Sequence, residues 1–348
     1  MRKSSKKIIL TGLVLILAAA YVFAKAKDKK NKNAPTDSFN GHVAKELNVG
    51  YVDATGGGQL SGVLGIARDK GFLDEEFKKI GVKINLIPMT GAGPAINEAL
   101  AGGSLDIGVL GDVPAVLGKA NGLDTVLIAY DGLHNIASVI SGKGTTYKSL
   151  RELKGKKIAT QKGAFMHRYL GILLKAEGLT FDDIEWINAQ ANVATEMILS
   201  GNVDAIVGAP AKLIEQGYNI VIDGRNHPLL HSGGGTIARR KYVEQNPDII
   251  KAYILAYTRA RDYAKENSNA LRDQWITTGE KASTYEYLHP KHDDWPTIVK
   301  TPETEANFKE VLQFLIEYDL TINKEGFSIE NWYDGRFAEY AVAEAAKK

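Results

Sequence analysis

Four short segments that combine glycine with polar residues are the strongest candidates for chemistry in this sequence. Each follows a predicted strand and precedes a predicted helix, where open backbone N–H groups and the positive end of the helix dipole favour an anion. Because such loops meet at the carboxyl edge of an α/β sheet, we expect them to face one ligand. The segments are Thr55–Gln59, Thr90–Pro94, Gly111–Pro114 and Lys162–Phe165.

The most informative of these segments begins at Lys162, because His167 follows in the first turn of the next predicted helix. A lysine, the N–H group of Gly163 and an imidazole at this place could together hold an oxyanion. The same pattern also fits a solvated lysine beside a partly buried histidine. Arg225 lies in a turn-rich loop and could be a second anion contact or an ordinary surface charge.

Most other chemistries find no support in the sequence. The chain has no cysteine, which excludes thiol catalysis, iron–sulfur clusters and cysteine zinc sites. It contains neither a phosphate-binding P-loop nor a dinucleotide fingerprint, and no hydrolase, zinc-protease or kinase motif. The segment 289–294 holds two histidines, but their spacing fits no familiar zinc motif. We therefore expect a protein that is not an enzyme and that uses neither a metal nor a cofactor.

Short apolar runs alternate with helical patterns from Leu47 onward, which is typical of βαβ units around parallel sheets. A first set of strands is predicted at 47–52, 82–88, 105–110 and 125–130, with helices at 60–69, 93–101 and 113–120. A second set has strands at 157–160, 184–188, 203–207 and 219–222, with helices at 165–176, 193–199 and 211–215. After Tyr242 the pattern becomes helical, with a helix predicted at 248–265.

An internal similarity indicates two related halves. Glu98–Asp106 and Glu196–Asp204 carry Glu, Gly and Asp at identical spacing, and each is followed by an apolar run and a Pro-Ala pair. In both copies a helix would end on a glycine with positive φ, and a short strand would follow. We expect the same helix–strand unit in both halves.

The first 33 residues have a charge unlike that of the rest of the chain. They carry nine basic residues and one acidic residue, a net charge of +8, whereas the whole chain carries +2 and the remainder therefore −6. Basic residues flank the apolar stretch Ile8–Ala24, which predicts a signal peptide or an uncleaved N-terminal anchor at 1–26, followed by a flexible linker at 27–45. The basic charge belongs to this segment, so it gives no evidence for nucleic-acid binding.

Further motifs follow in order between residues 46 and 265: Leu47–Tyr51, Ala67–Leu73, Ala99–Gly108, Gly111–Pro114, Leu150–Ile158, Gln161–Gly163 with His167, and Gly201–Ala205. With these motifs the chain resembles the ABC-transporter substrate-binding proteins of the nitrate/sulfonate/taurine family. The resemblance implies an α/β, two-lobed, type II periplasmic-binding-protein fold. Each lobe would be a mostly parallel sheet flanked by helices, with the ligand in the cleft between the lobes.

The resemblance also implies a division of the chain and a set of contacts. Lobe 1 would comprise 46–138 plus 238–348 and lobe 2 would comprise 139–237, with crossovers near 134–142 and 231–238. Ligand contacts in the family come from the loop after the first strand, the Gly-Asp-x-Pro turn and the Lys-Gly loop. Together with the glycine loops, they give these predicted ligand-binding residues: Gln59, Gly91, Gly111, Asp112, Pro114, Lys162, Gly163, Phe165, His167, Pro210 and Arg225.

The implied function is that of an exported monomer, in the periplasm or on the outer face of the cytoplasmic membrane. It would bind a small oxyanion, such as an aliphatic sulfonate, taurine or nitrate, and deliver it to an ABC permease and ATPase complex, with no nucleic-acid partner. Many relatives carry Trp-Asp-Pro where this chain has Gly208-Ala209-Pro210, which leaves the ligand open. The related vitamin-precursor enzymes rely on cysteine motifs, which are absent here. A ligand-sensing or enzymatic protein on the same fold remains the alternative.

Overall fold

Two five-stranded sheets organise the structure, which is a computed structural model. It describes residues 41–53, 57–133, 135–208, 213, 215–227, 229–230, 232–279, 281–289, 295–323 and 325–347. The predicted export segment at 1–26 lies outside these residues, and so do most of the predicted linker at 27–45, most of the predicted helix at 211–215, and Pro210. None of the helices in the described ranges is both long enough and apolar enough to cross a membrane.

The first sheet has the strand order β2-β1-β3-β10-β4. β1 pairs in parallel with β2 and β3, whereas β10 is antiparallel to both β3 and β4. Four strands therefore run one way and the fifth runs against them. The strands are β1 (Glu46–Val52), β2 (Lys83–Met89), β3 (Ile107–Gly111), β4 (Thr125–Tyr130) and β10 (Gly234–Arg239).

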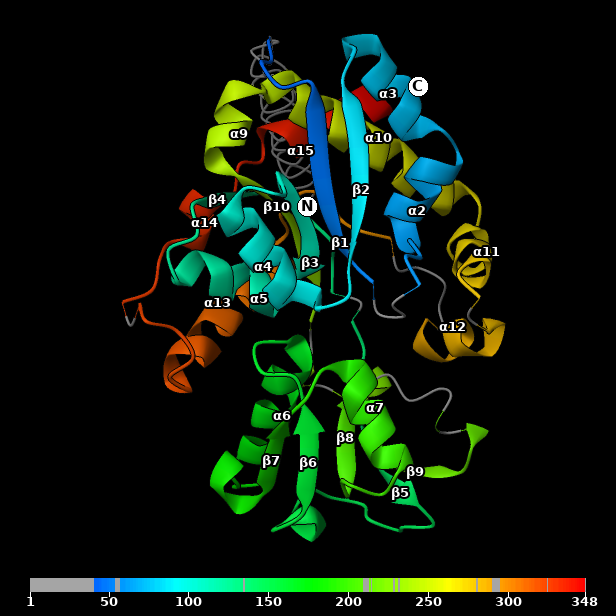
Figure 1. Cartoon of the computed structure of the whole chain (residues 1–348), viewed down its shortest axis with the longest axis vertical. Helices are drawn as coiled ribbons and strands as arrows, with labels where there is room; N and C mark the ends of the chain where they lie inside the picture. The colour runs from blue at the N-terminus through cyan, green and yellow to red at the C-terminus, as the bar shows by residue number, and fades with distance from the viewer. Residues whose placement is uncertain are drawn as a thin grey trace, which may run out of the picture. The chain divides into compact units, whose positions relative to one another are not determined.

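The second sheet repeats this arrangement with the order β7-β6-β8-β5-β9. β6 pairs in parallel with β7 and β8, and β5 is antiparallel to both β8 and β9. In each sheet the antiparallel strand is the one that arrives from the other sheet along the chain. The strands are β5 (Ser138–Lys143), β6 (Lys157–Thr160), β7 (Glu185–Asn188), β8 (Ala205–Gly208) and β9 (Tyr218–Ile222). We call each sheet with its packed helices a lobe, and Figure 1 shows the first lobe above the second.

Helices cover both sheets, and several of them begin directly after a strand (Figure 1). The helices of the first lobe up to residue 120 are α2 (Gly62–Asp69), α3 (Phe72–Ile80), α4 (Ala92–Gly102) and α5 (Asp112–Ala120). The second lobe contains α6 (Phe165–Ala176), the 3-10 turn η2 (Phe181–Asp183) and α7 (Ala191–Leu199). The chain then forms α9 (Arg240–Gln245), α10 (Pro247–Glu266), α11 (Ala270–Thr277), α12 (Ala282–Leu288), α13 (Pro302–Glu317), α14 (Ile329–Trp332) and α15 (Arg336–Ala345).

The predicted helix–strand repeat is confirmed. Gly103 follows α4 with φ +76° and Gly201 follows α7 with φ +74°, a region that favours glycine because it has no Cβ. The next strand then begins beside β1 in the first sheet and beside β6 in the second. The backbone N–H of Asp106 donates to the Asn48 carbonyl and that of Asp204 to the Lys157 carbonyl, each at 2.9 Å. Both lobes therefore contain the same unit of a helix, a glycine with positive φ and a short strand.

Up to residue 239, the predicted elements that lie in the described residues agree closely with the structure, with three omissions. Beyond it, only the helix at 248–265 was predicted with bounds, although six more helices occur in the described residues. Strands 125–130 and 157–160 and helix 165–176 have the predicted bounds, whereas α3, β5 and β10 were missed. β5 and β10 fall where crossovers were predicted at 134–142 and 231–238, so the linking segments are shorter than expected. Because β10 pairs within the first sheet, the chain returns to the first lobe by Gly234 rather than at 238.

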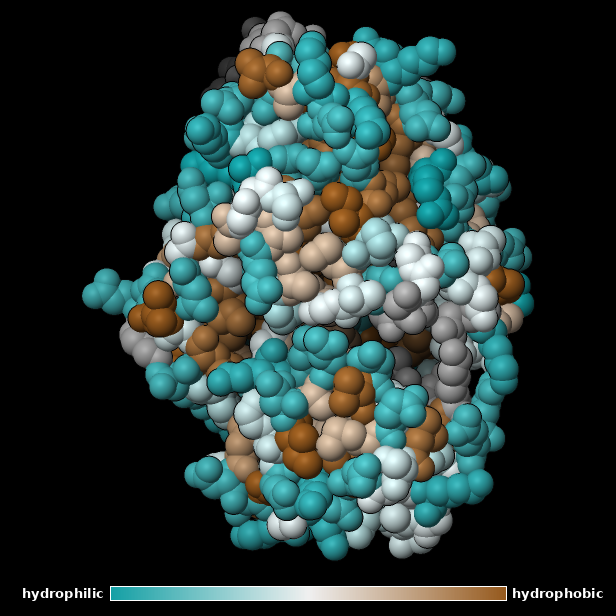
Figure 2. All heavy atoms as spheres, in the orientation of Figure 1, coloured by the Kyte–Doolittle hydropathy of each residue, from teal (hydrophilic) through white to brown (hydrophobic). Residues whose placement is uncertain are grey.

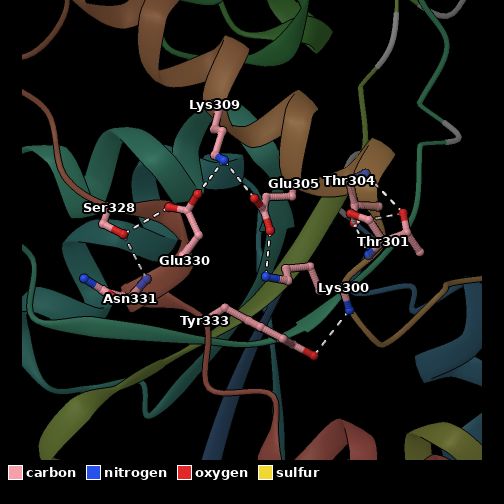
Figure 3. A network of polar contacts seen from close by, with 9 residues as sticks. All are labelled: Lys300, Thr301, Thr304, Glu305, Lys309, Ser328, Glu330, Asn331 and Tyr333. Atoms are coloured by element: carbon pink, nitrogen blue, oxygen red, sulfur yellow. Dashed lines mark hydrogen bonds and ion pairs between the residues drawn. The ribbon is translucent and has the colours of Figure 1, made fainter. Parts of the chain in front are cut away.

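A polar network joins α13, the residues just before it and α14 to one another (Figure 3). Thr301 and Thr304 form a capping box that starts α13, the arrangement in which side chains satisfy the first N–H groups of a helix. Lys309 of α13 contacts both Glu305 and Glu330, and so links α13 to α14. Beneath this network, Phe308 and Trp332 lie in one apolar core with residues of β4 and α5.

Candidate ligand-binding site

A pocket of about 590 Å³ is lined by residues of both lobes. In Figure 2 the surface is hollowed between the two lobes, with apolar atoms visible inside. The first lobe contributes the ends of β1, β3 and β4, and the second lobe contributes the loops before α6 and α7. This is the crevice beyond the carboxyl ends of parallel strands where ligands of α/β proteins bind.

Five helix N-termini meet at the pocket, three from the first lobe and two from the second. In none of these five helices does the N-cap side chain bond to the first turn. In α5, however, the Asp112 N–H donates to the Gly233 carbonyl at 3.1 Å and the Val113 N–H donates to the Asp112 carboxylate at 2.7 Å. The other four helices therefore present their first N–H groups and dipoles to the pocket as potential anion donors, whereas α5 contributes its dipole. The lining residues at these turns are Ser61–Leu64, Thr90, Ala92–Pro94, Gly111, Pro114, Ala164–Met166 and Gln190–Asn192.

Gly93 allows two of these turns to approach each other closely. A Cβ at Gly93 would lie 2.3 Å from Cγ of Pro114, a distance that real Cβ atoms do not adopt. The first turn of α4 therefore packs against the first turn of α5, and both line the pocket. Asn97 supports the same contact, because its side-chain amide donates to the Pro114 carbonyl at 2.8 Å.

The formal charges in the described lining are negative. They belong to Asp53 and Asp131, and the lining among the described residues includes no lysine or arginine. Asp53 accepts the Gly58 N–H at 2.8 Å, which folds the loop after β1. Asp131 accepts the Tyr257 hydroxyl at 2.6 Å, and burial, followed by the nearby Asp131 charge, raises the pKa of Tyr257 far above its usual value. Any anion here must be held by neutral donors.

Comparison with known proteins identifies the family of this chain. The model of the family described as NMT1/THI5 like matches residues 61–270. The chain belongs to that family. The matched region contains β2 to β10 and the five helix N-termini at the pocket.

Two relatives of this NMT1/THI5-like protein have names that concern binding. A putative aliphatic sulfonates-binding protein of Bacillus subtilis is 28% identical over 268 residues, which cover 75% of this chain and 76% of the relative. A solved structure, the putative periplasmic sulfonate-binding protein of a sulfonate ABC transporter from Methylobacillus flagellatus, is 25% identical with a TM-score of 0.72. That match covers 87% of this chain and 95% of the solved chain.

The comparisons also include an enzyme. A 4-amino-5-hydroxymethyl-2-methylpyrimidine phosphate synthase of Candida albicans is 28% identical over 202 residues, covering 53% of this chain and 58% of the enzyme. Binding proteins and enzymes therefore both occur among the relatives. The Bacillus subtilis and Methylobacillus flagellatus matches each cover a larger share of this chain than the synthase does.

The predicted ligand-binding residues divide into three groups in the structure of this NMT1/THI5-like protein. Gly111, Pro114 and Phe165 line the pocket. Gln59 and Gly91 do not line it, although their neighbours Leu60, Thr90 and Ala92 do. Asp112, Lys162, Gly163, His167 and Arg225 lie outside the lining, and Pro210 lies outside the described residues.

Asp112 does not line the pocket; it holds the first turn of α5, which does. Its side chain is fully buried, and its carboxylate accepts the Ser232 hydroxyl at 2.9 Å, the Gly233 N–H at 3.1 Å and the Asn307 amide at 2.6 Å. These bonds join the α5 turn to the returning crossover and to α13. Asn307 in turn accepts from the buried Arg168 of α6 at 3.2 Å, which extends the network into the second lobe.

His167 is a neutral aromatic residue rather than a cationic anion contact. Its ring stacks on Trp186 with centroids 4.7 Å apart and lies 5.8 Å from the Phe314 ring of α13. Burial, with a smaller effect of the Lys162 charge, lowers the pKa of His167 to about 4. Lys162 itself is exposed. The structure therefore agrees better with the alternative interpretation of this segment, a solvated lysine beside a buried histidine. Gly163, with φ +75°, shapes the turn before α6.

Arg225 is occupied by contacts outside the pocket. Its guanidinium donates to Asp223 at 3.0 Å and lies over the Tyr287 ring of α12, 4.0 Å from the centroid. The predicted anion contact from this residue is therefore replaced by a contact between α12 and the loop after β9.

One part of the lining was not predicted at all. Residues 271–296 supply an apolar and aromatic side of the pocket through Leu271, Trp275, Tyr285, His289 and Pro296. The sequence signal that could have found them is the concentration of aromatic residues in the helical region after 270, but nothing in it indicates that this region returns to the cleft. Within the described ranges, no group of three or more potential metal ligands comes together.

Proposed function

We propose that this protein is the extracytoplasmic solute-binding component of an ABC importer and that its ligand is a monoanionic organosulfonate. The observation that carries the proposal is the pocket, where five helix N-termini from two lobes converge. Backbone N–H groups at helix N-termini bind oxyanions without help from a cationic side chain. A ligand bridging both lobes would stabilise their closed arrangement and give the membrane complex a state to recognise.

The negative charge of the lining favours ligands with one negative charge over ligands with two. Asp53 and Asp131 lie in the lining, and a second negative charge on the ligand would be repelled by them in a partly dry pocket. A sulfonate carries one charge over three acceptor oxygens, whereas sulfate carries two charges. The pocket therefore favours a sulfonate over sulfate by repulsion as well as by contact.

The remaining features of the proposal concern partners and location. The segment at 1–26 directs export or anchors the chain, and the lobes act outside the cytoplasmic membrane as a monomer. The partners are a permease and an ATPase, without nucleic acid. The ligand leaves unchanged, a view supported by the absence of cysteine and by the sulfonate-binding names of two relatives that match most of this chain.

Calorimetric titration of the full chain tests this function. We expect micromolar or tighter binding of alkanesulfonates, about 8 kcal/mol or more of binding free energy. Butanoate should bind at least tenfold more weakly than butanesulfonate, and sulfate should give no heat. NMR of the ligand after incubation should show it intact. If no sulfonate, and neither taurine, nitrate nor bicarbonate, gives a heat of binding, the proposed function is wrong. If NMR shows a new product, the protein is an enzyme and the non-enzymatic role is wrong.

A pair of glycine variants on α4 tests whether sulfonates bind in this pocket. Gly93→Ala places a Cβ 2.3 Å from Pro114 and must separate the first turns of α4 and α5. Gly102→Ala, at the other end of the same helix, meets nothing within 4 Å. We expect the first variant to weaken sulfonate binding about tenfold or more, since small misplacements of binding groups are costly. The second variant should bind like the natural chain.

A further inference from the structure

One side of the pocket, next to the start of α2, is apolar and aromatic. α11 contributes Leu271 and Trp275, and α12 with the residue after it contributes Tyr285 and His289. Leu60, Val63 and Leu64 before and within α2 continue this surface. We call Leu271, Trp275, Tyr285 and His289 the aromatic wall.

The aromatic wall is held in place from behind. Gln274 of α11 donates through its side-chain amide to the Leu60 carbonyl at 3.1 Å and to Asp69 at 2.7 Å. A Cβ at Gly65 would lie 2.7 Å from this amide, so α11 sits directly on α2. Ring contacts connect the wall internally, with centroids 6.0 Å apart for Trp275 and Tyr285. The rings therefore have fixed positions when a ligand arrives.

Contacts on α12 join the aromatic wall to the second lobe. Lys281 and Ser283 at its start each reach a carboxylate oxygen of Glu215 at 2.7 Å. Tyr287 receives the Arg225 guanidinium on its ring face. A wall attached to both lobes limits the length of a ligand that fits between the lobes.

The volume of the pocket is large for a small oxyanion. About 590 Å³ lies within the range of pockets that enclose drug-sized ligands. Nitrate or methanesulfonate would occupy the glycine turns and leave the aromatic wall in contact with water. Burial of apolar surface against the wall is the remaining source of affinity.

We infer that Trp275 and Tyr285 are specificity-determining residues that select organosulfonates with a large apolar, ring-containing body over short ones. This inference rests on the proposed function, because the sulfonate group is assigned there to the helix N-termini. Aromatic side chains offer rigid surfaces for a ring in stacked or edge-on contact. Both residues lie beyond residue 270, where the match to the family model ends, so the wall is set by the part of the chain outside that match.

A series of sulfonates tests the inference on the full chain by calorimetry. Methanesulfonate, octanesulfonate and naphthalene-1-sulfonate share the head group and differ in the apolar body. We expect naphthalene-1-sulfonate to bind at least tenfold more tightly than methanesulfonate. Trp275→Ala should reduce naphthalene-1-sulfonate affinity about tenfold or more and leave methanesulfonate affinity within about twofold, since methanesulfonate does not reach the wall.

Two further variants test whether the effect of Trp275→Ala comes only from a disturbed α11. Ile276→Ala removes a side chain on the same helix that is 39% exposed and does not line the pocket, and it should leave the whole series unchanged. Trp275→Phe keeps a ring at the wall and should retain most of the preference. Equal affinities across the natural protein's series, or an equal loss for both ligands in Trp275→Ala, would overturn the inference alone. Failure of every sulfonate to bind would overturn the proposed function and the inference with it.

Discussion

The two lobes share a strand order but differ in how they secure the same aspartate. In the first lobe the carboxylate of Asp106 accepts the Asn48 N–H at 2.9 Å, and in the second lobe that of Asp204 accepts the Lys157 N–H at 2.8 Å. Asp106 also receives the guanidinium of Arg239 at 2.6 Å. The equivalent position on the other antiparallel strand is Gly142, which has no side chain to offer.

This difference shows that a repeated unit can be built with or without a salt bridge. The backbone N–H groups of Arg239 and Gly142 donate to the carbonyls of Asp106 and Asp204, at 3.0 Å and 3.1 Å, so their register is the same. Asp106 is 4% exposed, whereas Asp204 is more accessible to water. A buried carboxylate requires more compensation than one that water can reach, and the arginine supplies it.

The largest effect is expected for removal of the first-lobe aspartate. Asp106→Ala leaves the Asn48 N–H without its acceptor and Arg239 without its anion, and should lower the free energy of unfolding by about 3 kcal/mol. Asp204→Ala is the matched control and should cost about 1 kcal/mol, because its partner can be solvated. Urea unfolding of the full chain measures both. Equal losses would contradict the idea that the lobes differ in burial at this position.

The second lobe should respond more strongly to acid, through His167. Its pKa is lowered to about 4, so the unfolded chain binds this proton more readily, and the stability present above pH 6.5 is lost as the pH falls toward 4. Between pH 7 and pH 5 the natural chain should lose about 2 kcal/mol through this group. His167→Phe, which retains a ring in the cluster, should lose correspondingly less in urea unfolding at the two pH values. An unchanged pH dependence would show that folding does not lower the pKa of His167.

The smallest effect should come from making the first lobe resemble the second. Arg239→Ala removes the guanidinium but leaves the Asn48 N–H on Asp106, which is the arrangement of Asp204. We expect a loss of about 1.5 kcal/mol in thermal or urea unfolding, because Asp106 keeps the Asn48 N–H but loses a charged donor. Arg240→Ala removes a more exposed arginine paired with Asp124 at 2.9 Å and should cost a few tenths of a kcal/mol. A loss for Arg239→Ala as large as for Asp106→Ala would mean that the two lobes are not built alike.

Most of the fold could be predicted because its signals are local. The apolar spacing of α6 buries Leu170, Leu173 and Leu174 on one face, and the bounds of this helix were predicted without error. β5 and β10 were missed because each pairs with strands that lie far from it in the sequence. The glycine turns led to Gly111, Pro114 and Phe165 in the pocket, since a turn after a parallel strand has a fixed direction.

The sequence by itself determined the family, the repeated helix–strand unit and the edge of the sheets where a ligand binds, because these depend on short patterns of apolar residues and glycine. Only the tertiary structure decided which side chains line the pocket at that edge. Asp112 and His167 turned inward because α13 supplies Asn307 and Phe314 against them. The aromatic wall reached the pocket because α11 packs on α2, more than 200 residues away in the sequence. Long-range packing, rather than local pattern, therefore sets the chemistry of the site.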